Sequence, residues 1–237
     1  MTLRYHKIGI IGALDEEVDE LVKNLIPNPL TLVPAQTYDM GTCFYDGQIG
    51  KQEVVVVKCG VGKVNAAIAT QRLIDNFGCD AVMKIGVAGA VAPEVKKNDI
   101  VISQDMLEHD MDAFDQPGVI PNMDSSVFVA DNALIEAAKQ ACEKVIGPER
   151  YHVGRHVSGD QFICTNEKKE WLKRTFGALS AEMEGAALAH TAVVNKVPFV
   201  VLSSISDLAD DDAVESFEET KDEAVDYTSA VVLQMLR

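Results

Sequence analysis

The sequence predicts an α/β fold, because short runs rich in β-branched residues alternate along it with longer helical stretches. Several of the short runs are continuously apolar, as strands buried on both faces of a sheet are. A chain of 237 residues with 47% hydrophobic residues can bury a full core. We therefore expect one domain that spans residues 1–237.

The expected elements alternate from the first apolar run to a C-terminal helix. The strands are expected at 7–13, 53–59, 80–86, 99–104, 153–158 and 198–205. The helices are expected at 15–26, 63–77, 131–145, 167–176, 183–195 and 213–236. The alternating segment 37–57 contains Asp46-Gly47 and Gly50-Lys51, which are turn signals typical of antiparallel hairpins. The stretch 110–130 is the longest irregular one, and such loops are often functional.

A formal net charge of −16 argues against binding to nucleic acid or to an anionic membrane, because both reward clusters of Lys and Arg that this sequence lacks. We interpret the charge as a contribution to solubility. The first apolar run, Ile8 to Leu14, is followed at once by three acidic residues and has no cleavage-site pattern. It is therefore predicted to be a strand rather than a signal peptide. No run approaches the length of a membrane span.

The cysteines are odd in number, scattered, and without a Cys-x-x-Cys pair. They are Cys43, Cys59, Cys79, Cys142 and Cys164. This usage is typical of reduced, mostly buried thiols in a cytosolic protein, so a cytoplasmic location is expected.

The stretch from Ser180 to Asp207 gives the strongest indication of a functional site. Glu182-Met183-Glu184 opens an apolar helix, and Asp207 comes directly after a continuous apolar strand. Open α/β sheets bind ligands at the carboxyl ends of their strands, so Asp207 lies where chemistry is expected. Carboxylates accept hydrogen bonds from vicinal hydroxyls, while a thioether packs on a ring. The pattern therefore predicts a sugar-binding site.

Two glycine-containing segments give weaker indications. The segment 60–63 is not a P-loop, because Val57 and Val64 stand where that motif needs Gly and Ser or Thr. Asn65 breaks the dinucleotide fingerprint as well, which leaves a plain strand-to-helix turn. The segment Gly86–Ala90 follows an apolar strand, and its small residues either form a tight turn or let a ligand approach the backbone.

Metal binding is not expected. His109-Asp110-Met111-Asp112 resembles half of a metal site, but no second cluster accompanies it. His152 and His156 are four residues apart on a strand-like segment, where that spacing does not build a helical ligand pair.

Five segments stand in the order and at the spacing of one known family. They are Lys7–Ala13 followed by Asp15-Glu16-Glu17, Cys59–Ala67, Val157–Ile163, Glu182-Met183-Glu184 and Ile205-Ser206-Asp207. Together they resemble the nucleoside phosphorylase/hydrolase superfamily, and most closely its methylthioadenosine/S-adenosylhomocysteine nucleosidases. The resemblance implies a three-layer α/β/α fold around a central mixed, partly barrel-like sheet. It also implies an N-ribosyl hydrolase of adenine thionucleosides in methionine salvage, a homodimer that needs no cofactor.

The resemblance assigns roles to the acidic residues. It implies that Asp207 protonates N7 of the departing adenine, with Ser206 to orient it, and that Glu17 activates the water. Acidic residues are also ordinary at a helix N-terminus, which is our interpretation of Glu16. Glu184 is expected to bind the ribose hydroxyls, and Met183 is expected to lie along the sugar.

Further contacts to the nucleoside are implied in the same way. Phe162 is expected to stack on the purine while the backbone of Ile163 reads its edge, although core packing would explain both residues equally well. The remaining substrate-binding positions that the motifs indicate are Val87, Ala88, Gly89, Glu182 and Ser203. Phe114 and Pro121 are the nearest counterparts of an aromatic residue and a proline that close the alkylthio pocket of the other subunit.

Two positions depart from the family pattern. Val87 replaces a serine whose hydroxyl helps to hold the water, and Ser203 replaces an arginine. Loss of that cation is expected to raise the pKa of Glu17 and to weaken its hold on water. Three functions stay open: a nucleosidase with a rearranged water site, a relative with another nucleoside substrate or a phosphorylase activity, and a nucleoside-binding protein without catalysis. Glu17 favours hydrolysis, because phosphate calls for Arg and backbone donors rather than a carboxylate.

Overall fold

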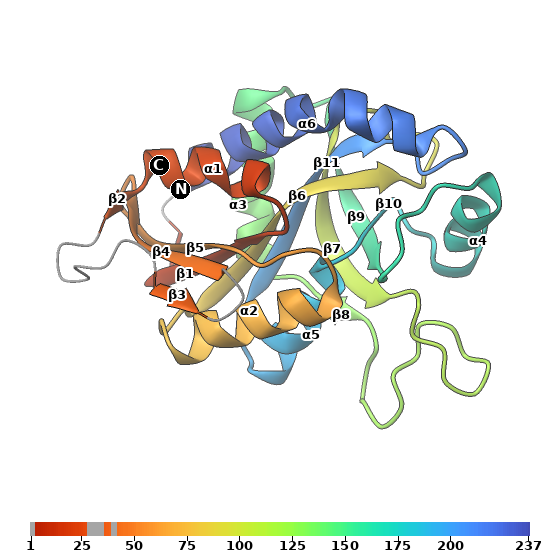
Figure 1. Cartoon of the computed structure of the whole chain (residues 1–237), viewed down its shortest axis with the longest axis horizontal. Helices are drawn as coiled ribbons and strands as arrows, with labels where there is room; N and C mark the ends of the chain where they lie inside the picture. The colour runs from red at the N-terminus through yellow and green to blue at the C-terminus, as the bar shows by residue number, and fades with distance from the viewer. Residues whose placement is uncertain (1–2, 28–35, 39–41) are drawn as a thin grey trace.

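A computed structural model describes residues 3–27, 36–38 and 42–237, which form a mixed sheet between helices (Figure 1). The strands are β1 Lys7–Gly12, β2 Ile26–Pro27, β3 Gln36–Tyr38, β4 Thr42–Ile49, β5 Gln52–Lys58, β6 Ala81–Ala90, β7 Ile100–Glu108, β8 Phe128–Val129, β9 Tyr151–Ser158, β10 Ser180–Glu182 and β11 Phe199–Asp207. The helices are α1 Asp15–Asn24, α2 Lys63–Asp75, α3 Asn132–Val145, α4 Asn166–Phe176, α5 Gly185–Val194 and α6 Ala213–Leu236.

The sheet closes on itself at one end. Its order is β10-β9-β7-β11-β6-β1-β5-β4-β2, and β10 pairs with β6 as well as with β9. The strands β6, β11, β7, β9 and β10 therefore form a closed five-stranded barrel, from which β1, β5, β4 and β2 extend as an open sheet. This arrangement confirms the mixed, partly barrel-like sheet that the resemblance implies.

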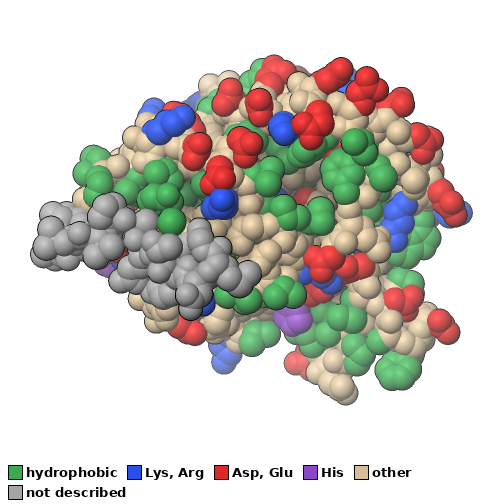
Figure 2. All heavy atoms as spheres, in the orientation of Figure 1, with side chains coloured by type: hydrophobic (Ala, Val, Ile, Leu, Met, Phe, Trp, Pro, Cys, Tyr) green, Lys and Arg blue, Asp and Glu red, His purple; other side chains and the backbone are tan. Residues whose placement is uncertain are grey.

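Helices cover both faces of the sheet. Helices α1, α3 and α6 pack against one another on one side, with α6 on β6 and β11, while α2 and α5 pair on the other side (Figure 1). The expected three layers are thus present. Figure 2 shows acidic side chains crowded on the surface over α6, in keeping with a surface that serves solubility.

The predicted elements are present, with differences at the barrel. The predicted strands 80–86 and 99–104 run on to Ala90 and Glu108, because their last residues pair with β10, β9 and β8. The tight turn considered for Gly86–Ala90 is therefore wrong. The predicted helix 183–195 begins only at Gly185, because Ser180–Glu182 is a strand.

The antiparallel hairpins predicted in 37–57 are confirmed in β3-β4-β5, although residues 39–41 lie outside the described residues. No helix in the described ranges is long and apolar enough to cross a membrane.

Parallel pairing brings several strand ends to one edge. β1 and β11 both run parallel to β6, and β10 runs parallel to β9. The runs Ile8–Ile11 of β1, Ala81–Ile85 of β6 and Phe199–Leu202 of β11 are buried and apolar, apart from Lys84. Polar side chains are therefore confined mainly to the strand ends, where the candidate site lies.

Candidate active site

A cavity of about 470 Å³ lies at the carboxyl ends of β1, β6, β10 and β11. Eleven of the residues expected from the sequence line it: Glu17, Val87, Ala88, Gly89, Phe162, Ile163, Glu182, Met183, Glu184, Ser206 and Asp207. These residues come from segments up to 190 positions apart. The cavity has the size and the mixture of apolar wall and few polar groups that small-molecule sites have.

Glu17 is held at the cavity by backbone donors. Its side chain is buried at the start of α1, where Oε2 accepts hydrogen bonds from the N–H of Ala13 at 2.5 Å and of Leu14 at 3.2 Å. Its Oε1 accepts from the N–H of Val87 at 3.1 Å. Gly86 makes this approach possible, because a Cβ there would lie 2.1 Å from Oε1 of Glu17. The carboxylate is thus fixed without any side-chain donor.

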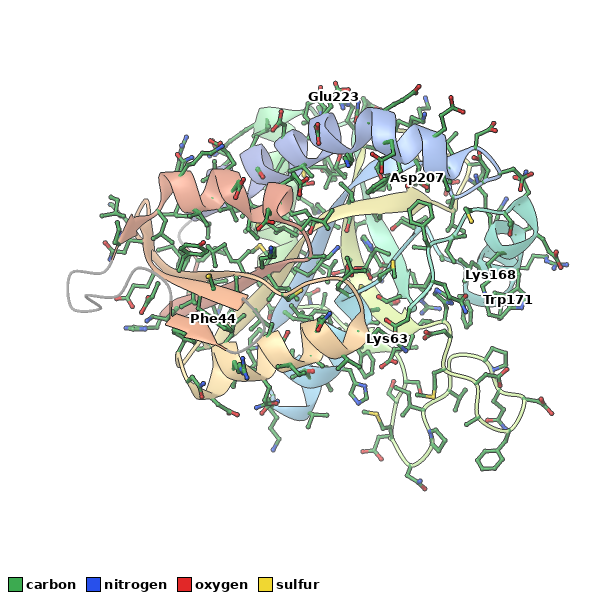
Figure 3. All side chains as sticks on the ribbon, in the orientation of Figure 1. Phe44, Lys63, Lys168, Trp171, Asp207 and Glu223 are labelled. Carbon is green, nitrogen blue, oxygen red and sulfur yellow. The ribbon has the colours of Figure 1, made fainter. Side chains whose placement is uncertain are left out.

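Asp207 is the buried acid at the end of β11, beneath α6 (Figure 3). Ser206 Oγ donates to Oδ2 at 2.9 Å, and the N–H of Ala209 donates to Oδ1 at 2.8 Å. Burial raises the pKa of Asp207 above its ordinary value, although both hydrogen bonds oppose this. The predicted contact between Ser206 and Asp207 is confirmed, and the acid is biased toward the protonated form.

Glu182 is held by several hydrogen bonds and by an ion pair. Its two oxygens accept hydrogen bonds from the backbone N–H groups of Glu184 and Gly185 at 2.8–3.0 Å and from Ser158 Oγ. Lys84 Nζ lies 3.1 Å from its Oε2. Burial favours the neutral acid, but the Lys84 charge and these hydrogen bonds outweigh it and lower the pKa of Glu182. Glu182 lines the cavity with its oxygens already satisfied, so we expect it to shape the site.

Glu184 has far fewer partners. It accepts one hydrogen bond, from the N–H of Gly62 at 2.8 Å, and its Oε2 lies 3.6 Å from Lys84 Nζ. Burial raises the pKa of Glu184 to about 7. The turn 60–63, which the sequence identified only as a strand-to-helix turn, therefore also helps to position the predicted sugar-binding acid.

The apolar wall of the cavity combines expected and unexpected residues. Phe162 is 41% exposed and packs edge-on against Phe217 of α6, with ring centroids 5.6 Å apart. Val214 and Lys221 of the same helix also line the cavity. Val214, Phe217 and Lys221 could not be recognised from the sequence, because they lie on an ordinary helix that only the tertiary fold brings to the cavity.

Three expected residues lie elsewhere. Ser203 is fully buried in β11 and does not line the cavity, so the structure gives no support to its predicted substrate contact. Its hydroxyl has no hydrogen-bond partner within the described ranges. Phe114 is 89% exposed, and neither it nor Pro121 lines the cavity of its own chain. Both belong to the loop between β7 and β8, which projects from the body of the molecule (Figure 1).

Lys84 is the functional candidate that the sequence analysis missed. Its side chain is 1% exposed in the middle of β6, directly behind the acids that line the cavity. The available signal was a lysine inside the otherwise apolar run Ala81–Ile85. A buried ammonium is costly unless it is paired, so such a residue points to carboxylates nearby.

The residues of the segment 109–112 make other contacts. Among the described residues, no group of three His, Cys, Asp or Glu side chains is placed to hold a metal ion. Asp110 pairs with Lys63 at 2.6 Å, and burial lowers the pKa of His109 to about 4, which keeps that ring neutral.

The fold and the acidic cavity define a class of nucleoside-processing proteins. Residues 7–237 match the family model described as the Phosphorylase superfamily, and the chain belongs to that superfamily. A 5′-methylthioadenosine/S-adenosylhomocysteine nucleosidase of Tolumonas auensis is 39% identical over 236 residues, which cover 98% of this chain and 99% of the relative. The chain therefore belongs to the methylthioadenosine/S-adenosylhomocysteine nucleosidase family.

Solved structures agree with this assignment. The nucleosidase from Neisseria meningitidis in complex with methylthio-immucillin-A has a TM-score of 0.89 and 31% sequence identity, with 97% of this chain and 98% of that chain covered. The futalosine hydrolase of Helicobacter pylori has a TM-score of 0.86 and 32% identity, with 97% of each chain covered. The fold is thus shared by hydrolases named for different nucleosides.

Proposed function

We propose that this protein hydrolyses the N-glycosidic bond of 5′-methylthioadenosine and S-adenosylhomocysteine, and releases adenine and the thioribose sugar. Membership of the family supports the reaction class, an N-ribosyl hydrolase. The observation that supports it most directly is the placement of a fixed carboxylate, Glu17, and a buried acid, Asp207, on one cavity. No cofactor enters this proposal.

Asp207 acts as the general acid. An adenine anion is a poor leaving group, so the base must gain a proton, at N7, as the bond to the sugar breaks. A free aspartic acid has a pKa of about 3.9 and would be ionised at neutral pH. Burial raises the pKa of Asp207, which favours the protonated form that donation requires.

Glu184 and Met183 bind the sugar. Glu184 keeps an oxygen for the ribose hydroxyls, because it has a single hydrogen-bond donor within the described residues. Its negative charge stabilises the positive charge that develops on the ribose as the bond breaks. Met183 lies on the same wall, and its thioether packs on the ring.

Glu17 activates the water. Three backbone N–H groups hold its carboxylate, and the one from Val87 does not depend on the side chain at position 87. Inorganic phosphate at this place would be repelled by the negative charge of the Glu17 carboxylate. Among the described residues that line the cavity, the one cation is Lys221, and it pairs with Glu218 at 3.1 Å. This charge distribution favours water over phosphate as the nucleophile.

The purine lies between Phe162 and the β6 backbone. Phe162 stacks on the base while the backbone of Ile163 reads its edge, and Val87, Ala88 and Gly89 contact the nucleoside on the other side. A side chain at 89 would not fit, because a Cβ there would lie 2.7 Å from Oδ1 of Asp207.

A homodimer completes the site in this proposal. Phe114 and Pro121 project on the β7–β8 loop and reach the alkylthio pocket of the partner subunit. An apolar patch on and before α2 supports a second copy as the occupant, because Val61, Val64 and Ile68 are 48%, 69% and 49% exposed. We also propose that residues 1–237 act as one domain, in the cytoplasm, in methionine salvage. The five cysteines are all free, as a reducing compartment would keep them.

The product analysis tests the reaction. Purified protein is incubated with methylthioadenosine, with and without inorganic phosphate, and adenine and the sugar product are quantified. We expect phosphate-independent release of adenine and free methylthioribose. A sugar 1-phosphate would identify a phosphorylase, and saturable binding without adenine release would identify a binding protein. Because the shared fold includes a futalosine hydrolase, futalosine is assayed in parallel to test the preferred 5′-substituent.

A further inference from the structure

Lys84 is a buried cation beneath the sugar-binding acids. Its side chain is 1% exposed, and its Nζ lies 3.1 Å from Oε2 of Glu182 and 3.6 Å from Oε2 of Glu184. The charges of Glu182, Glu17 and Glu184 together raise the pKa of Lys84 against the opposing effect of burial, so the ammonium stays protonated. Lys84 does not line the cavity, so any effect on the substrate acts through these carboxylates.

The sheet register relates Lys84 to Ser203. In the parallel pairing of β6 with β11, Lys84 lies opposite Val201, and Gly86 lies opposite Ser203. Alternate residues of a strand share a face, so Lys84 and Ser203 leave neighbouring strands on the same face of the sheet. A cation at either position would therefore lie under the same part of the site. The structure therefore has a positive charge in this region, on Lys84 of the neighbouring strand β6, although position 203 is a serine.

Lys84 acts unequally on its two partners. Glu182 has several other donors that keep it ionised, namely Ser158 Oγ and two backbone N–H groups. Glu184 has one backbone donor, so the ammonium is the main group that favours its ionised form against burial and against the negative charges of Glu182 and Glu17. Without Lys84, Glu184 would be a neutral acid at neutral pH. A neutral acid cannot stabilise a positive charge on the sugar.

We propose that Lys84 is a positioning residue that favours the ionised form of Glu184 for the ribose, and that it supplies from β6 the positive charge that the family pattern places at position 203. This inference deepens the proposed function and rests on it for the role of Glu184. The dependence of Glu184 on Lys84 is a property of the free protein and does not require turnover.

The primary experiment is therefore a titration of the free protein. The carboxyl carbons of glutamate are labelled with ¹³C, the Glu184 signal is assigned by its absence in Glu184→Gln, and its midpoint is followed by NMR against pH. In Lys84→Gln we expect the Glu184 midpoint to rise by about one pH unit or more, because an opposite charge within about 4–6 Å typically shifts a carboxyl by 1–3 units. Lys84→Arg retains the charge and should keep the midpoint near that of the native protein.

The pH dependence of kcat/KM is the second readout. Because the ionised form of Glu184 is the active one, a higher pKa moves the acid limb to higher pH. Lys84→Gln should then lower kcat/KM about tenfold or more at pH 6.5, and the deficit should narrow by pH 9. A purely structural role would lower activity at every pH alike. Adding Ser203→Arg to Lys84→Gln should move the acid limb back toward the native position.

Lys7→Gln is the matched control. Lys7 is also a lysine on a strand and pairs with the Asp46 carboxylate at 3.2 Å, but it lies at the start of β1, away from the cavity. It should leave the Glu184 midpoint unchanged. An unchanged midpoint in folded Lys84→Gln overturns the proposal. If Lys84→Gln does not fold, Lys84→Met takes its place in the same titration, and an unchanged midpoint there likewise overturns the proposal. A raised midpoint in folded Lys84→Gln/Ser203→Arg would show that an arginine at 203 does not replace the charge of Lys84, which contradicts the second half of the proposal. If the native protein binds methylthioadenosine without cleaving it, the proposed function alone is contradicted. The titration would still test whether Lys84 favours the ionised form of Glu184.

Discussion

The Glu17 end and the Asp207 end of the cavity hold their carboxylates in different ways. Glu17 accepts three backbone N–H groups at the start of α1, where the helix dipole also favours a negative charge. Asp207 accepts one hydroxyl and one N–H, and burial raises its pKa. The donors thus match the roles that we propose, because three backbone donors fix the carboxylate of the proposed base in place, while burial favours the protonated form of the proposed acid.

The two departures from the family pattern bear on the Glu17 end. Val87 takes part through its backbone N–H and not through its side chain, and Ser203 is buried away from the cavity wall while Lys84 supplies a cation. The Asp207 end keeps the family sequence from Ile205 to Asp207. The Glu17 end therefore differs from the family pattern in its side chains, while the backbone donor to Glu17 and a buried cation are present, and the following variants test that difference.

The largest effect is expected at the acid end. Asp207→Asn keeps the shape of the side chain but cannot donate a carboxyl proton, so turnover of methylthioadenosine should fall roughly a hundredfold or more. Binding of the nucleoside, measured by calorimetry, should largely persist. Asp210→Asn is the matched control three residues away and should retain turnover. Normal turnover by Asp207→Asn would mean that Asp207 is structural.

The base end should respond almost as strongly, and it has an internal control. Glu17→Gln removes the negative charge that activates water, so kcat should fall about a hundredfold. Glu16→Gln changes the adjacent residue, which also lines the cavity but is exposed and has no hydrogen bond to β6. Its effect on kcat should stay within about threefold, as expected for a surface charge near a helix N-terminus. Equal losses in both variants would contradict the assignment of the base.

Gly86→Ala tests the position of the Glu17 carboxylate without removing its charge. A Cβ at 86 would lie 2.1 Å from Oε1 of Glu17, so Gly86→Ala must displace that carboxylate. We expect kcat to fall about tenfold or more, because small misplacements of a reacting group are costly. Gly78→Ala is the matched control, since Gly78 also has a positive φ, of 66°, but has open space around its Cβ position.

Thermal unfolding and kcat distinguish the two glycine variants. Backbone strain alone should cost Gly78→Ala about 1 kcal/mol of stability and no activity. Gly86→Ala should lose both stability and activity. A folded Gly86→Ala protein with native kcat would show that the position of Glu17 is not critical.

The sequence predicted the elements well but the full lengths of the barrel strands poorly. Strands such as 7–13 and helices such as 213–236 were predictable, because continuous apolar runs and helical stretches are local signals. The extension of β6 through Gly86–Ala90 was not predictable. It depends on the pairing of Gly89 and Ala90 with β10, whose residues lie about 90 positions further along the chain. Small residues at a strand end look like a turn until a partner strand is in place.

The same distinction applies to the site. Acids at strand ends, such as Asp207, could be predicted, because their position follows from the sheet. Lys84 and the α6 residues Val214 and Phe217 could not, because their part in the site depends on packing between elements distant in the sequence. The expectation for Ser203 left out Lys84 for that reason, since Lys84 lies on another strand.

The smallest effect is expected where the departures themselves are reversed. Val87→Ser restores the family hydroxyl, but Glu17 already holds the N–H of residue 87 at 3.1 Å, so kcat for methylthioadenosine should change less than about fivefold, the scale of one hydrogen bond. Val87→Ala is the control for the loss of side-chain volume that accompanies Val87→Ser. Adding Ser203→Arg to Val87→Ser should give no gain and should lower the melting temperature, because a second cation would enter a fully buried position beside Lys84. A rise in kcat of tenfold or more in either protein would show that the water side is weakened, and that the backbone donor and Lys84 do not compensate for the two substitutions.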